Sequence, residues 1–99
     1  MDTQTIERTT LSNLIYNENY TRKVLPFIKG TYFEVREERI IFEEISNFVD
    51  KYKKIPTQTS LEIEVGERKD LSEIEYKKVV DIIKTLNPVE VDFDWLVDH

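Results

Sequence analysis

The feature that most constrains the fold is the spacing of apolar side chains between residues 41 and 52. They are Ile41, Ile45, Phe48, Val49 and Tyr52. This spacing of i, i+4, i+7, i+8 and i+11 is typical of one face of an amphipathic helix, and it turns Glu43, Glu44 and Asp50 towards solvent. Lysines crowd the end of the segment, where positive charge favours the helix dipole, and Ile55-Pro56 then stops the helix.

The chain contains few of the residues that make turns, with two glycines and three prolines among its 99 residues. A sandwich of short hairpins needs turn residues at intervals of about ten positions, so we do not expect that fold. A chain of this length forms one domain, and its 39% of hydrophobic residues can build a core. We therefore predict an all-α fold, a compact bundle of about five to six short helices.

Apolar periodicity and stop signals predict the other elements. The expected helices span residues 5–17, 18–28, 59–65 and 73–86, and a last helix begins at residue 95. Pro26 kinks or shortens the second helix, and Gly30 supplies a left-handed stop after it. We expect this helix to bring Tyr20, Val24, Phe27 and Ile28 together. Residues 61–65 alternate in polarity, so a strand is the alternative there, but no partner strand is evident.

Polar residues mark where these helices begin. Asn17 and Asn19 suit the end of the first helix and the cap of the second. Thr59-Ser60-Leu61-Glu62 resembles a capping box, in which a hydroxyl and a carboxylate satisfy free backbone N–H groups. Ser72-Glu73-Ile74-Glu75 is a second such pattern. Both patterns favour helices after residue 59.

The residues that common catalytic and metal sites require are missing from the chain. There is no cysteine, the single histidine is His99, and the glycines Gly30 and Gly66 stand alone, outside any phosphate-binding loop. Serine-histidine and thiolate chemistry therefore have no base or nucleophile, and zinc has too few ligands. We predict no catalytic, cofactor-binding or metal-binding residue in these 99 residues. The lack of cysteine and of a long apolar run predicts a cytoplasmic protein that does not enter a membrane.

The charge and the aromatic residues favour protein contacts over nucleic-acid contacts. The net charge of −6 argues against a domain that follows a phosphate backbone. The cluster Lys51-Tyr52-Lys53-Lys54 is the best candidate for a DNA contact, although lysines at a helix end also have a structural role. Near the C-terminus, Phe93 and Trp95 are candidate protein-interface residues, because large aromatics anchor interfaces. Alternatively, these two side chains close the domain's own core.

In order and spacing, several segments resemble the N-terminal domain of DnaB-family replicative helicases, most closely the T-even-type phage version. The segments are Leu11 to Asn17 (LSNLIYN), Val24-Leu25, Thr31-Tyr32-Phe33, Ile41 to Ile45 (IFEEI), Pro56-Thr57 with Leu61, and Trp95-Leu96-Val97. The resemblance covers roughly residues 5 to 97. It departs from the bacterial pattern at Glu38, where that branch commonly has a histidine three residues before Ile41.

The resemblance implies a non-catalytic part of a hexameric helicase that works in DNA replication. Residues 1–92 would form the globular helical head in the collar, and residues 93–99 would start a helical hairpin. The implied partners are primase, a helicase loader and other helicase subunits, while single-stranded DNA passes through the ring with little direct binding to this domain. NTP and magnesium would belong to a motor domain outside the 99 residues. In that family, dimers depend on the hairpin, so we expect the isolated chain to be mainly monomeric.

Two other readings remain open. The chain could be a stand-alone acidic phage protein that binds a host or replisome protein, which its net charge of −6 allows. It could also be a DNA-binding helical module. That reading needs a basic recognition helix, and the best candidate, residues 73–86, carries Lys77, Lys78 and Lys84 against three acids.

Overall fold

The computed structural model describes residues 3–86 of the chain, and within them it contains helices and no strand. The α-helices are α1 (Thr3–Tyr16), α2 (Glu18–Val24), α3 (Arg36–Tyr52), α4 (Gln58–Gly66) and α5 (Glu73–Thr85). Two short 3-10 turns, η1 (Leu25–Phe27) and η2 (Gly30–Tyr32), join α2 to α3. The predicted all-α fold is confirmed. The predictions for residues 87–99, including the last helix, lie outside the described residues.

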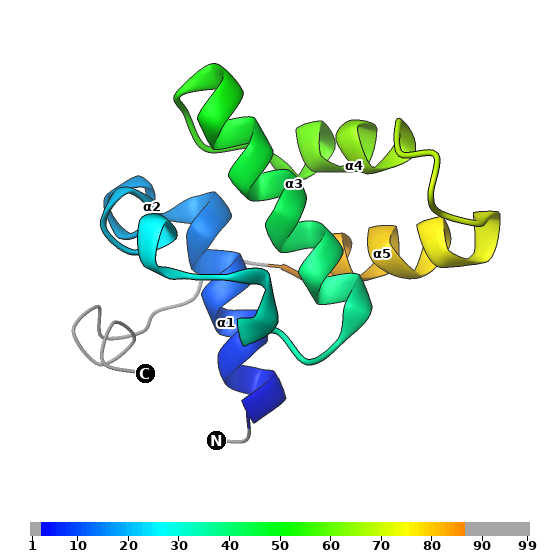
Figure 1. The fold of residues 1–99 in the computed structure, drawn as a ribbon, viewed down its shortest axis with the longest axis horizontal. Coiled ribbons are helices and arrows are strands. Elements are labelled where there is room, and N and C mark those ends of the chain that lie inside the picture. Colours follow the sequence, from blue (N-terminus) through cyan, green and yellow to red (C-terminus); the bar gives the residue numbers. More distant parts are fainter. Residues whose placement is uncertain (1–2, 87–99) are drawn as a thin grey trace.

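Helix α3 is the element around which the others are arranged (Figure 1). It packs against α1, α4 and α5, while α2 packs against α1. Every one of the five α-helices contributes to the core. Its buried members are Leu11, Leu14, Ile15, Tyr20, Val24, Phe33, Ile40, Ile41, Phe42, Ile45, Leu61, Val65, Val79, Ile83 and Leu86. The apolar segments noted in the sequence thus each supply side chains to this one core.

Helix α1 buries polar side chains as well as its apolar stripe. Leu11, Leu14 and Ile15 are buried. Several buried neighbours are polar, and the helix backbone satisfies two of them: the Thr10 hydroxyl donates to the Ile6 carbonyl at 2.9 Å, and the Asn13 amide donates to the Thr9 carbonyl at 3.0 Å. Such back-bonding lets short polar side chains enter a core. It explains why the apolar stripe of this helix is imperfect in the sequence.

Asn17 separates α1 from α2, as predicted, and it also caps the second helix, whereas Asn19 lies inside that helix. Its side-chain oxygen accepts a hydrogen bond from the Tyr20 N–H at 3.1 Å. Helix α2 ends at Val24, because Pro26 lies in the following 3-10 turn, and that turn leaves Phe27 83% exposed instead of packed with Tyr20 and Val24. The prediction of a left-handed stop at Gly30 is wrong, since no described glycine has a positive φ. The chain is extended at Lys29 and has no helix end to stop there.

Helix α3 has the predicted period, with two corrections. Glu44 is buried, not turned to solvent, because it lies against Arg68 from the loop after α4. Tyr52 is 44% exposed and does not extend the buried stripe, since the helix ends at this residue. Lys53 closes the helix in the left-handed conformation, with φ 59°, and its N–H donates to the Val49 carbonyl. This is a common way for a helix to end.

Helices α4 and α5 complete the fold. The helix predicted over residues 59–65 is present and spans Gln58–Gly66, but the cap is Thr57, whose hydroxyl accepts from the Ser60 N–H at 3.0 Å. The capping box predicted at residues 59–62 is therefore wrong, because the helix begins before it. The box at Ser72 and Glu75 is present in full and starts α5. Gln58 ties the two helices together by donating to the Ile83 and Leu86 carbonyls.

Candidate protein-interaction surface

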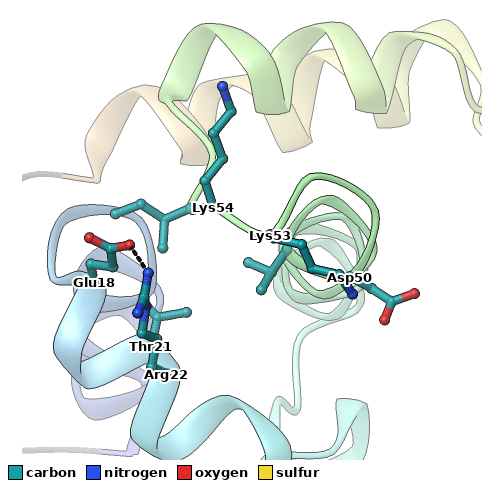
Figure 2. Close-up of a pocket in the computed structure, with 8 residues that line it drawn as sticks. Glu18, Thr21, Arg22, Asp50, Lys53 and Lys54 are labelled. Carbon is teal, nitrogen blue, oxygen red and sulfur yellow. Dashed lines mark hydrogen bonds and ion pairs between the residues drawn. The ribbon is translucent and has the colours of Figure 1, made fainter.

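A pocket of about 290 Å³ lies between α2 and the C-terminal end of α3 (Figure 2). Its lining residues are Glu18, Thr21, Arg22, Val49, Asp50, Lys53, Lys54 and Ile55. In Figure 2, Arg22 and Glu18 lie on one side of the gap and Lys53 and Asp50 on the other, and the Asp50 carboxylate points away from α2. The pocket therefore combines aliphatic walls with basic side chains around its opening.

The α2 wall is held in place by hydrogen bonds to α1. The Thr21 hydroxyl, which is buried, lies 2.8 Å from the Leu14 carbonyl and 3.0 Å from the Asn17 carbonyl, so it can donate to either. Arg22 forms an exposed ion pair with Glu18 at 2.7 Å, one helical turn away. The carboxylate thus neutralises the guanidinium on this side of the pocket.

The α3 wall owes its charge to the way the helix ends. The left-handed residue Lys53 turns the chain away from the helix axis, and Lys54 follows it at the pocket. Neither Lys53 nor Lys54 has a side-chain ion pair within residues 3–86. Lys51 behaves differently: its Nζ lies 5.1 Å from the centre of the Tyr52 ring, and the tyrosine raises the pKa of this lysine. The helix C-terminus favours positive charge at all three positions.

A second pocket, of about 420 Å³, lies beside α3 on the side of the α4–α5 loop. It is lined by Arg36, Arg39, Ile40, Glu43, Arg68 and Asp70. Two of its three arginines have acidic partners: Arg36 pairs with Glu75, and Arg68 pairs with Asp70 at 2.8 Å and with Glu44 at 3.0 Å. Arg68 holds the pKa of Asp70 down at about 2, while burial raises the pKa of Glu44. This pocket is a structural ion-pair network.

Glu38, the residue that departs from the bacterial pattern, is buried in the fold and pairs with Arg8. Its side chain is fully buried, and its Oε2 accepts a hydrogen bond from Arg8 at 2.8 Å. Its Oε1 has no hydrogen-bond partner within the described part of the chain. Burial raises the pKa of Glu38, and the nearby Arg8 opposes that shift. The pair joins α1 to α3 inside the fold and lies in neither pocket.

The structure tests only part of the predicted site. Phe93 and Trp95 lie outside residues 3–86, so their interface role stays a prediction. Within those residues no group of three histidine, cysteine or acidic side chains could hold a metal ion. The cluster at Lys51 to Lys54 does reach a pocket, through Lys53 and Lys54. The exposed Phe27 was missed, because its place in a helical pattern favoured burial.

These features define a class: a small, acidic, all-helical domain with pockets on its described surface. The chain is homologous to part of a phage DnaB-like replicative helicase. It is 32% identical over 87 residues to the DnaB-like replicative helicase of Enterobacteria phage T4, and the match covers 88% of this chain but 18% of that relative. The resemblance noted in the sequence is thus confirmed.

The other comparisons gave no match to a protein-family model or to a solved structure. No helix among residues 3–86 is long and apolar enough to cross a membrane.

Proposed function

We propose that this chain is the non-catalytic N-terminal head of a hexameric replicative DNA helicase, where it forms the collar and mediates subunit and primase or loader contacts. The observation that carries the proposal is the match to the phage helicase over 87 residues, which covers nearly all of this chain and a small part of the relative. A domain of that size can support a motor without containing one. The host cell cytoplasm is the compartment in which a phage-encoded helicase would work.

The chemistry of the described residues supports a role in contacts. They contain no set of side chains that fits a metal, and the glycines Gly30 and Gly66 are not part of a phosphate-binding loop. We therefore assign no step of NTP hydrolysis to them and place NTP and magnesium in the motor. The buried pairs of Arg8 with Glu38 and of Arg68 with Glu44 join elements that are distant in sequence. A rigid body of this kind can present fixed surfaces to partners.

The proposal is tested by binding to the primase of the organism that encodes the chain. The purified chain is titrated into labelled primase by fluorescence anisotropy and then added to a priming reaction that contains the complete helicase. We expect saturable binding and a loss of helicase-stimulated primer synthesis as the chain competes for primase. Failure to bind either primase or loader, with no effect on priming, would contradict a contact role in the collar.

The alternative is a stand-alone acidic protein that binds a host or replisome protein, and the net charge of −6 is compatible with it. The size of the protein in cells separates the two functions. A helicase head is found as part of a much larger chain, whereas the alternative requires a protein of about the size of these 99 residues.

A further inference from the structure

The positive charge of this acidic chain is concentrated in two stretches of sequence. Residues 19–33 and 51–61 contain no acid. Their six cations are Arg22, Lys23, Lys29, Lys51, Lys53 and Lys54. The other 73 residues hold eight cations and all twenty acids, for a net charge of −12. The chain is therefore strongly polarised along its sequence.

The fold brings these two stretches together at one site. Residues 19–33 contain most of α2, and residues 51–61 begin at the end of α3, so both stretches contribute to the pocket between α2 and α3, together with Glu18, Val49 and Asp50, which lie just outside them. In Figure 2, Lys53 and Lys54 belong to the side of the gap opposite Arg22, with Lys54 extending away from the gap and Lys53 lying beside Asp50. Because Glu18 neutralises Arg22, we call this pocket and the two lysines beside it, Lys53 and Lys54, the basic face. Two acids also line the pocket: Glu18, which pairs with Arg22, and Asp50, whose carboxylate points away from α2.

The pocket at the basic face is also apolar inside. Val49 and Ile55 contribute to its walls together with Thr21, and its volume of about 290 Å³ is large enough for one apolar side chain. A phosphate group needs donors and gains nothing from aliphatic walls, whereas a side chain such as leucine gains about 1.5–3 kcal/mol from full burial. The apolar pocket thus favours an apolar side chain of the ligand, and the lysines beside it favour acidic groups of the same ligand.

We propose that the basic face binds an acidic segment of a partner protein, with one apolar side chain in the pocket and flanking carboxylates on Lys53 and Lys54. Complementary charge would steer the segment to this end of the molecule and away from the acidic remainder. That remainder, with a net charge of −12, repels a nucleic acid, whose phosphates continue past the basic face. The inference does not depend on the helicase role, because it rests on the pocket and the charge distribution alone.

The test uses the 99-residue chain and two labelled probes. One probe is a twelve-residue peptide of aspartate and glutamate with a single central leucine, and the other is a twelve-nucleotide oligothymidine. The disrupting variant is Lys53→Asn/Lys54→Glu, in which asparagine suits the left-handed position. The control is Lys77→Asn/Lys78→Glu, which makes the same charge change on exposed residues of α5, away from α2 in Figure 1.

Fluorescence anisotropy at low salt should show that the peptide binds and that the disrupting variant weakens it by about tenfold, while the control changes it by less than about twofold. Replacing the leucine of the peptide with alanine should also weaken binding. Equal weakening by both variants, tighter binding of the oligothymidine, no effect of the leucine, or no peptide binding at all would each overturn the proposal. Circular dichroism melts of both variants confirm that they fold, since all four lysines are exposed.

Discussion

Replacing Arg8 with methionine removes the only charged partner seen for the buried carboxylate of Glu38. In the native fold, the Arg8 guanidinium donates to Glu38 Oε2 at 2.8 Å, and Glu38 Oε1 has no partner among the described residues. Methionine keeps most of the aliphatic stem, so the packing of α1 changes little. The substitution thus isolates the effect of leaving a buried charge unpaired.

The size of the effect follows from the burial of the two side chains. Removing one member of a buried pair costs roughly 3–5 kcal/mol. Arg8 is 34% exposed while Glu38 is fully buried, so water screens part of the interaction. We expect Arg8→Met to lower the free energy of unfolding by about 2–3 kcal/mol at pH 7, at or just below the low end of that range. The control is Arg22→Met, which breaks an exposed pair with Glu18 and should cost about 0–0.5 kcal/mol.

Urea denaturation followed by circular dichroism, at pH 7 and at pH 4.5, measures both the loss and its origin. Burial raises the pKa of Glu38, so the folded chain binds this proton more tightly than the unfolded chain. Loss of Arg8 raises that pKa further, and lowering the pH then neutralises the unpaired carboxylate. The difference between Arg8→Met and wild type should therefore shrink at pH 4.5. A loss below about 0.5 kcal/mol, or one that is equal at both pH values, would refute a buried charge pair.

Three further predictions concern the fold. Asn17→Ala removes the cap of α2 and should cost about 1 kcal/mol in urea denaturation, whereas Asn19→Ala, with no cap to lose, should cost less. Leu61→Ala empties a fully buried position and should cost about 2–5 kcal/mol, with a matching fall in the melting temperature; a loss below about 1 kcal/mol would contradict the core. The urea midpoint of the wild type should rise as the pH falls from 7 towards about 4.5, because the pKa values of Glu38 and Glu44 are raised. It should fall again as the pH approaches 2, where Asp70 loses its charge, and a midpoint that decreases steadily below pH 7 would contradict these shifts.

Local patterns predict the helices whose signals are continuous in sequence. The period of α3 and the capping box of Ser72 depend on residues that are close together in the sequence. Both could therefore be predicted, and the structure confirms them. The buried acids were not predictable in this way. Glu38 and Glu44 look like parts of a solvated face, and only the fold brings Arg8 and Arg68 to them from 30 and 24 residues away.

The same distinction applies to the candidate site. The lysines near residue 53 stand out in the sequence, but their pocket needs a wall from α2, some thirty residues earlier in the chain. Phe27 shows the converse error, because the periodic pattern continued through Pro26 while the helix itself did not. A surface formed by elements that are distant in the sequence can therefore be identified only from the structure.

The most direct test of the helicase assignment is the size of the protein that contains this chain in cells. An antibody raised against the chain is used to probe a lysate of the cells that express it, by denaturing gel and by gel filtration. The account predicts a polypeptide several times heavier than the 11.9 kDa of these residues, which elutes as a hexamer in the presence of nucleotide. A stable product at 11.9 kDa, with no larger form, would contradict it.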